Sequence, residues 1–317
     1  MKEQNFDTGE LKAELERSLG FALRSLTRLD GASAVNFRAV RDSDGFAFAV
    51  KCSPPESRQR FERLVEHLEA LKGSKAVRRI FEDKCPATFR GWNLLCTAWC
   101  FGERIFPDRL ADDQLDACLD EYLGFSAAMQ NVKTFEAVQP LRKWREAALR
   151  KRSGLAGLIM RRLLLEMKPE ECDYRPDLLR VIHGDFHHGN FLFVDGRVAV
   201  YLDLEEFRQG YPADDLLRYF TCAAEHLRWY ESGRRRGTLR AFARAVRRLP
   251  YSRHEWVVAI NGRFVSKMLM HTWDKRRIGL WQAVNLAWRF GFYRAMRRIV
   301  DDNLGTISGR ERNRRKP

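Results

Sequence analysis

Residues 181–207 read "VIHGDFHHGNFLFVDGRVAVYLDLEEF", and this stretch decides how the chain folds around its candidate site. Asp195 and Gly196 stand between two runs rich in Val, Leu and Phe, which is the sequence pattern of a β-hairpin with a two-residue turn. Continuing the register outward from that turn places Asn190 opposite Tyr201. The stretch therefore predicts a hairpin with polar side chains at its open end.

Several oxygen-bearing side chains converge at that end of the predicted hairpin. Asp203 follows its second strand, and Asp185 lies in the loop before the first, close to Asn190. One amide oxygen and two carboxylates supply hard oxygen ligands for Mg²⁺ and one spare base. His187 and His188 could suggest zinc, but no third soft ligand follows at a suitable spacing. We therefore expect an oxygen-ligated magnesium site.

Composition indicates a soluble globular protein with room for two lobes. The chain has 317 residues, of which 45% are hydrophobic and 31% charged. No apolar run reaches the roughly 18 residues of a membrane-spanning helix, and the charged N-terminus does not resemble a secretory signal. Seven scattered cysteines without a CxxC motif indicate reduced thiols. We expect a cytoplasmic protein.

Charge is unevenly distributed along the chain. Residues 228–317 hold 23 Lys and Arg against 6 Asp and Glu, a net charge of +17, whereas the remaining 227 residues have a net charge of −2. One interpretation is that helices solvate their outer faces with arginine. The other is a positive field that attracts an anionic substrate, a membrane surface or nucleic acid. The sequence leaves both open.

The periodicity of apolar residues predicts an α/β beginning and a helical remainder, an α+β fold. From about residue 112 onward the chain is expected to be mostly helical, apart from the stretch quoted above. The expected earlier elements are a helix over 9–28, strands over 35–40 and 46–52, a helix over 57–72, and strands over 87–89 and 94–99.

The motif "HGDFHHGN" resembles the aminoglycoside phosphotransferase and choline kinase superfamily, whose catalytic loop carries HGD where protein kinases carry HRD. The segment "LDLEEFRQGYPADDLLRYF" is similar to its D-x-E element and the later Asp that opens a helix. The resemblance implies a bilobal protein-kinase-like fold. It implies a small lobe over residues 1–99 with an antiparallel sheet and a helix, a large mainly helical lobe over 100–306, and a basic flexible tail over 307–317.

The resemblance also implies a kinase that uses ATP, with GTP left open, and Mg²⁺. Asp185 would accept the proton of the substrate hydroxyl or orient it for attack on the γ-phosphoryl group. Asn190 and Asp203 would hold Mg²⁺, and Glu205 would add a further contact to the metal or its ligands.

Upstream, the resemblance requires a lysine on a strand to reach the α- and β-phosphates. "FAFAVK" places Lys51 at the end of a predicted strand. Its carboxylate partner is expected on the next helix, where Glu62 is preferred and Glu66 is the alternative. "LDGASAVNF" resembles the superfamily's phosphate-covering loop, so that Gly31 and Ser33 are expected near phosphate.

Four further residues have expected roles through the same resemblance. "LLCTAWCFGE" is similar to the linker where backbone groups around Thr97 and Trp99 would meet the adenine. His183 is expected to bond backbone near the catalytic loop, and Asp215 is expected to brace that loop.

The acceptor is not fixed by the sequence. A hydroxyl of an anionic sugar or of a lipopolysaccharide-type glycan precursor fits the basic C-terminal region. Aminoglycosides, choline and ethanolamine are cations, which that region would repel unless local acids or a cage of aromatic rings intervened. Such a cage would draw on the tryptophans at 229, 256, 273, 281 and 288. A basic amphipathic helix over 280–300 leaves a peripheral membrane contact open.

The sequence is also compatible with two other classes of protein. The arginine clusters are compatible with a nucleic-acid-binding protein, and a kinase-fold scaffold without catalysis is a further alternative. Lys51, Asp185, Asn190 and Asp203 are all present, which favours an active enzyme with no nucleic-acid partner. The sequence does not determine the oligomeric state.

Overall fold

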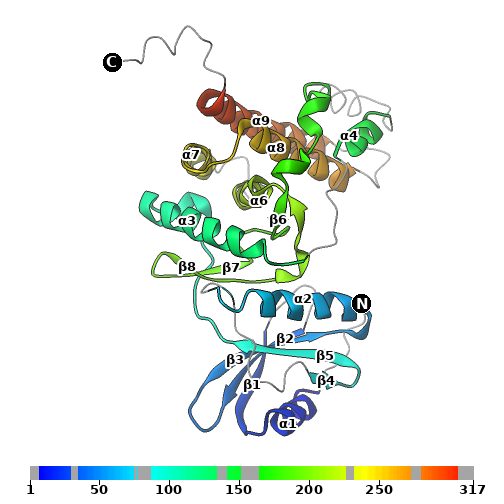
Figure 1. Cartoon of the computed structure of the whole chain (residues 1–317), viewed down its shortest axis with the longest axis vertical. Coiled ribbons are helices and arrows are strands. Elements are labelled where there is room, and N and C mark those ends of the chain that lie inside the picture. The colour runs from blue at the N-terminus through cyan, green and yellow to red at the C-terminus, as the bar shows by residue number, and fades with distance from the viewer. Residues whose placement is uncertain are drawn as a thin grey trace. The chain divides into compact units, whose positions relative to one another are not determined.

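The computed structural model describes residues 7–29, 35–74, 77, 87–133, 141–150, 164–225, 232–272 and 280–305 (Figure 1). Contacts divide the chain into two compact units. The first contains residues 1–104 and 190–206, and the second contains 105–189 and 207–317. The hairpin that follows the HGD motif thus groups with the N-terminal residues. The boundary expected at residue 99 stays a prediction, and the expected tail over 307–317 lies outside the described residues.

The first unit is built on an antiparallel five-stranded sheet in the order β1-β2-β3-β5-β4. Its strands are β1 (Leu23–Leu29), β2 (Val35–Arg41), β3 (Ala47–Ser53), β4 (Ala87–Phe89) and β5 (Trp92–Ala98). Helix α1 (Thr8–Leu19) packs on one face, where its leucines join the inward side chains of β2, β3 and β5 in a buried apolar core. The strands expected over 35–40, 46–52, 87–89 and 94–99 are therefore confirmed to within two residues.

The helix expected over 9–28 is wrong in its second half. Helix α1 ends at Leu19 because Gly20 adopts a left-handed conformation with φ 79° and donates its N–H to the carbonyl of Glu16. After this cap the chain turns into β1, which pairs with β2 along the edge of the sheet. The leucines between residues 19 and 29 fit the apolar spacing of a helix as well as that of a strand. Periodicity alone therefore predicts a helix that is too long.

Two more elements complete the first unit. Helix α2 (Arg58–Ala70) follows the short η1 (Pro55–Ser57) and contacts the 3₁₀ turn η5 (Leu204–Glu206). Strands β7 (Phe191–Val194) and β8 (Arg197–Tyr201) form the predicted hairpin.

The register of this hairpin differs from the prediction by one residue. Asp195 and Gly196 have φ values of 50° and 75°, as a turn of type I′ requires. Further along, Leu192 pairs with Val200, but Phe193 pairs with Val198, so that Ala199 is an extra bulged residue. Phe191 rather than Asn190 is therefore opposite Tyr201.

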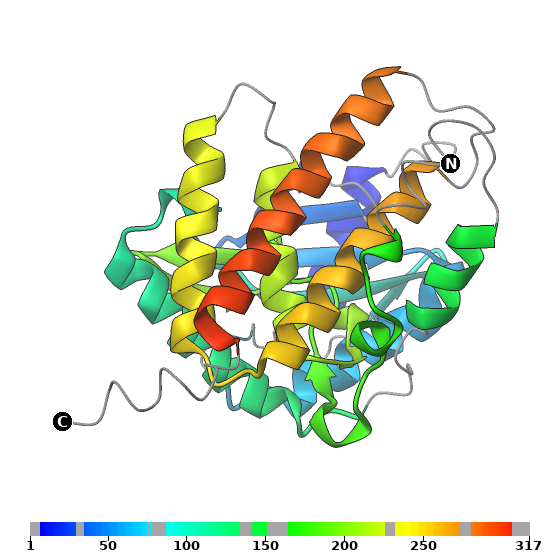
Figure 2. The same cartoon turned by 90° about the horizontal axis from the view of Figure 1, so that it is seen from above.

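The second unit is mainly helical. Its helices are α3 (Asp112–Met129), α4 (Leu141–Arg150), α6 (Pro212–Glu225), α7 (Ser232–Arg248), α8 (Arg253–Thr272) and α9 (Leu280–Leu304), with short 3₁₀ turns η2 (Pro107–Arg109), η3 (Pro169–Cys172) and η4 (Pro176–Leu178). Strands β6 (Arg180–Ile182) and β9 (Arg208–Gly210) pair beside the HGD motif. Figure 2 shows the long helices of this unit, in which α6 contacts α7 and α8, and α9 also contacts α7 and α8. No helix among the described residues is long and apolar enough to cross a membrane.

Candidate functional site

Strand β3 presents Lys51 on the face of the sheet opposite α1. Successive side chains of a strand point to opposite faces, so Val50 and Cys52 are buried in the core with α1 while Ala49 and Lys51 lie on the other face. In the sheet, Ala49 pairs with Thr97 of β5. The predicted strand position of Lys51 is thus what the structure shows.

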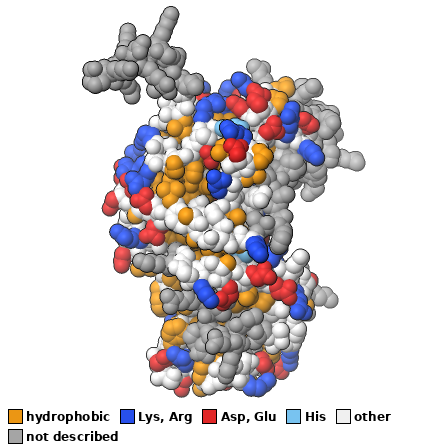
Figure 3. Space-filling view, in the orientation of Figure 1, with side chains coloured by type: hydrophobic (Ala, Val, Ile, Leu, Met, Phe, Trp, Pro, Cys, Tyr) orange, Lys and Arg blue, Asp and Glu red, His pale blue; other side chains and the backbone are white. Residues whose placement is uncertain are grey.

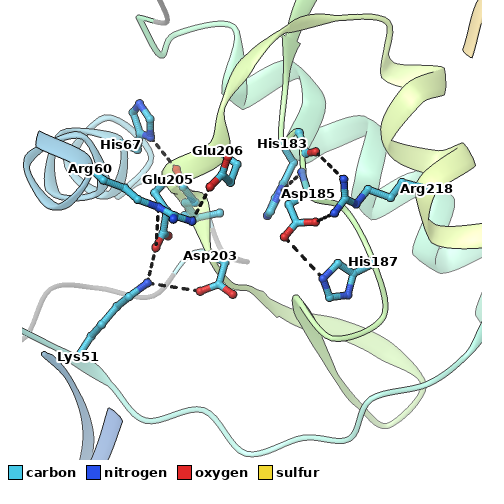
Figure 4. Close-up of polar contacts among 12 residues, drawn as sticks. Lys51, Arg60, His67, His183, Asp185, His187, Asp203, Glu205, Glu206 and Arg218 are labelled. Carbon is cyan, nitrogen blue, oxygen red and sulfur yellow. Dashed lines mark hydrogen bonds and ion pairs between the residues drawn. The ribbon is translucent and has the colours of Figure 1, made fainter. Parts of the chain in front are cut away.

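The ammonium group of Lys51 contacts two carboxylates that follow β8 (Figure 4). It donates to Oε1 of Glu205, which is buried on η5, and lies 3.4 Å from Oδ1 of Asp203. Asp203 is half exposed and has φ 53°, a left-handed conformation that is uncommon for a residue with a side chain. The chain therefore leaves strand geometry before Asp203, and the two carboxylates do not share a strand face.

Helix α2 holds η5 by polar contacts from one side. His67 lies with Nδ1 2.6 Å from the carbonyl oxygen of Leu204, and Arg60 forms an ion pair with Glu206 (Figure 4). Burial lowers the pKa of His67, although its hydrogen bond to Leu204 acts in the opposite direction. A neutral imidazole that donates from Nδ1 satisfies this geometry.

The structure does not bring Glu62 to Lys51. The Glu62 carboxylate accepts from Nε of Arg58 at 2.8 Å and is exposed, as is Glu66. The reason is helical phase, because Arg60 and His67 are seven residues apart and share the side of α2 that faces η5, whereas Glu62 is rotated about 200° from Arg60.

Asn190, Asp203 and Glu205 are the residues of the first unit that could hold a metal ion. Asn190 is buried, and its backbone carbonyl oxygen accepts the N–H of Leu202 at 2.7 Å. Oε2 of Glu205 is buried without a hydrogen-bond partner among the described atoms, while the Asp203 carboxylate reaches solvent. Spare carboxylate oxygens fit a hard cation such as Mg²⁺. No group of three or more His, Cys, Asp or Glu side chains that could together hold a metal ion occurs in the part of the chain that the structure describes.

In the second unit, Asp185 lies in the loop after β6. Its carboxylate contacts the guanidinium of Arg218 on α6 and lies 3.6 Å from Nε2 of His187 (Figure 4). Partial burial would raise the pKa of Asp185, but the hydrogen bond to His187 and the charge of Arg218 outweigh it and lower that pKa below its ordinary value. Asp185 is therefore an ionised carboxylate at neutral pH.

Asp215, near the start of α6, accepts three hydrogen bonds within the second unit. Its donors are the N–H of His183 at 2.7 Å, the N–H of Gly184 at 2.9 Å and the hydroxyl of Tyr122 at 3.1 Å. Burial raises the pKa of Asp215, against the effect of the two backbone donors. His183 is fully buried, and its Nδ1 accepts the N–H of Asp185 at 3.3 Å.

The remaining expected residues are less informative. Gly31 and Ser33 lie outside the described residues. Thr97 is buried in the sheet, and the N–H of Trp99 donates to the carbonyl of Ala47 at 3.3 Å.

Sequence reasoning missed three site residues, Arg60, His67 and Arg218. Arg218 had a usable signal, since it lies three residues after Asp215 and therefore on the same side of a helix.

Comparisons with known proteins agree with this architecture. A family model described as the phosphotransferase enzyme family matches residues 25–255. A candidate aminoglycoside phosphotransferase from Ralstonia eutropha JMP134 has a similar structure, with 18% identity, a TM-score of 0.55, and coverage of 94% of this chain and 99% of that one. The aminoglycoside phosphotransferase APH(4)-Ia, bound to ADP and hygromycin B, has 13% identity, a TM-score of 0.55, and coverage of 92% and 98%. The amicoumacin kinase hAmiN, bound to AMP-PNP and Ca²⁺, has 11% identity, a TM-score of 0.57, and coverage of 97% for both chains. No curated protein matches significantly.

Proposed function

Because the chain belongs to the phosphotransferase enzyme family, we propose that it is an ATP-dependent kinase that transfers the γ-phosphoryl group to a hydroxyl of a small molecule. The observation that carries the proposal is the convergence of Lys51 with Asp203 and Glu205 at the end of β8. An ammonium beside two carboxylates provides one group for phosphate oxygens and carboxylate oxygens for a cation. Relatives with this fold were solved with ADP or AMP-PNP, which supports ATP as the donor, and GTP is the alternative.

On the nucleotide side, Lys51 binds phosphate oxygens, and Asn190 and Asp203 hold Mg²⁺. A Mg²⁺ ion held by these residues would neutralise negative charge on the phosphates. Backbone groups near Thr97 and Trp99 are proposed to meet the adenine.

On the acceptor side, Asp185 orients the hydroxyl and accepts its proton during the transfer. Its lowered pKa keeps it ionised in the ground state, so that it is ready to accept throughout the neutral range. Asp215 fixes the backbone of His183 and Gly184, and His183 fixes the N–H of Asp185, which together hold the loop in one conformation.

We propose an anionic acceptor, such as an acidic or phosphorylated sugar of the kind found in lipopolysaccharide-type glycan precursors. Support comes from Arg218, which places a guanidinium directly beside the carboxylate of Asp185. Arginine binds phosphate and carboxylate groups through two parallel hydrogen bonds. An acceptor that carries such a group next to its hydroxyl would engage Arg218 and leave Asp185 to the hydroxyl.

The first experiment measures thermal stability with and without Mg-ATP and Mg-GTP, for the intact protein and for Asp203→Ala. We expect a rise in melting temperature for the intact protein that is smaller for the variant. Neutral and acidic sugars, with and without phosphate, would then be tested as acceptors. In that assay Asp185→Asn should lower kcat by about 10²–10⁴-fold while retaining nucleotide binding. An intact protein whose melting temperature responds to neither nucleotide would overturn the proposal.

A further inference from the structure

Helix α2 presents cations rather than a glutamate toward the end of β8. Arg60 forms an ion pair with Glu206 and lies 3.8 Å, measured from Nε, from Oε1 of Glu205. The helix glutamates Glu62 and Glu66 are exposed. Among the described residues, no carboxylate of α2 therefore contacts Lys51.

Glu205 lies between two cations. Its Oε1 accepts from the ammonium of Lys51 and faces Arg60, and only 6% of the residue is exposed. A buried carboxylate is stable as an ion only with such partners, and losing one of them leaves a charge without compensation. Lys51 is therefore held in place by the most buried acid in its surroundings, while the half-exposed Asp203 lies farther away, at 3.4 Å.

We propose that Glu205 is the residue that positions Lys51 for the phosphates, and that Arg60 fixes Glu205 from α2. The ion pairs run Lys51–Glu205–Arg60, so that α2 acts on the lysine through an arginine and a carboxylate of η5. Asp203 is then left for the metal ion. This inference rests on the proposed function, because a positioned Lys51 matters only if nucleotide phosphates bind.

The test compares three matched substitutions, Glu205→Gln, Glu62→Gln and Glu69→Gln, each in the intact chain and in a Lys51→Met background, and adds Arg60→Gln in the intact chain. Glu69 is an exposed residue of α2 paired with Lys72 and serves as the control. The affinity for ADP is measured by calorimetry in EDTA, which removes metal ligation, and kcat/KM for Mg-ATP is measured separately. Circular dichroism and thermal unfolding confirm that each variant is folded.

We expect Glu205→Gln to change metal-free ADP affinity at least threefold and to lower kcat/KM at least tenfold. Both effects should vanish in the Lys51→Met background, because coupled residues are not additive. Arg60→Gln should lower kcat/KM in the same direction by a smaller factor, and Glu62→Gln should behave as Glu69→Gln. An effect of Glu205→Gln that appears only with Mg²⁺, or that persists undiminished in the Lys51→Met background, would overturn the inference. If the intact protein binds no nucleotide, the proposed function fails instead.

Discussion

Asp214 and Asp215 are adjacent, the first partly buried and the second fully buried, and both have a raised pKa, yet they have different tasks. Asp215 accepts from the backbone of the HGD loop, as described above. Asp214 accepts the N–H of Tyr211 at 2.9 Å and the hydroxyl of Tyr174 at 3.0 Å on a single oxygen, Oδ2. At this scale, local sequence identifies an acidic pair, and the choice of Asp215 as the residue that braces the catalytic loop came from the family resemblance.

Burial raises the pKa of Asp214 to about 6. Between pH 4 and 6 the folded protein keeps a proton that the unfolded chain releases, so the stability of the fold falls as pH rises through this window. Asp214→Asn removes the charge and keeps the accepting oxygen. We expect the variant to be more stable than the wild type at pH 7, by at most about 3 kcal/mol, and the gain to shrink toward pH 4.

Urea unfolding at pH 4, 5 and 7 measures this difference. Asp177→Asn is the control, because the pKa of the exposed Asp177 is lowered by Arg175 and its effect on stability has the opposite sign. A gain for Asp214→Asn that does not depend on pH would contradict the argument.

Asp215→Ala leaves the N–H groups of His183 and Gly184 without their acceptor. Each unsatisfied buried donor costs about 1–3 kcal/mol, so we expect the free energy of unfolding to fall by about 3 kcal/mol or more. Tyr122→Phe removes one of the three donors and should cost only about 1 kcal/mol. Urea unfolding separates the two variants, and equal losses would mean that the loop backbone does not depend on Asp215.

Elements whose ends carry local chemical signals were predictable from the sequence. The turn at Asp195 and Gly196 and the alternation around Lys51 both follow from neighbouring residues. The bulge at Ala199 did not follow, because the apolar alternation of the hairpin carries no mark of it. The phase of α2 relative to η5 did not follow either, because it depends on packing between segments that are distant in the sequence. The roles of Glu62 and Arg60 were missed for that reason.

The two glycines Gly20 and Gly124 should respond oppositely to substitution by alanine. Gly20 ends α1 with φ 79°, where a side chain costs about 1–2 kcal/mol. Gly124 lies inside α3, and an added Cβ meets nothing within 4 Å, so Gly124→Ala should stabilise by about 0.5–1 kcal/mol. Thermal unfolding of the two variants measures both effects. A Gly20→Ala variant as stable as the wild type would contradict a left-handed cap that separates α1 from β1.

For the whole molecule, the charge is uneven along the sequence largely because the acidic partners of the late arginines precede residue 228. Many late arginines pair with acids of earlier elements within the second unit, and Figure 3 shows basic and acidic side chains interspersed on the visible face. These pairs are Arg234–Asp108, Arg244–Asp112, Arg244–Asp116, Arg248–Asp120, Arg294–Glu166 and Arg297–Glu171. The net charge of +17 over residues 228–317 therefore overstates the positive field available to a substrate, and Arg218 is the better support for an anionic acceptor.

The pairs between α3 and α7 follow a regular spacing, with aspartates four residues apart facing arginines four residues apart. Asp116 is central, since it accepts from Nε of Arg244 at 2.6 Å and from a second guanidinium nitrogen at 2.7 Å, and this contact lowers the pKa of Asp116. Asp116→Asn should destabilise the fold by about 1 kcal/mol. The loss should shrink in 1 M NaCl, because salt screens the attraction between Asp116 and Arg244 in the intact protein. Asp113→Asn is the control, since Asp113 is exposed and has no ion pair among the described residues. Melting temperatures at low and high salt test this prediction. A loss of stability that is equal at both salt concentrations would show that Asp116 stabilises the fold through packing and not through its charge.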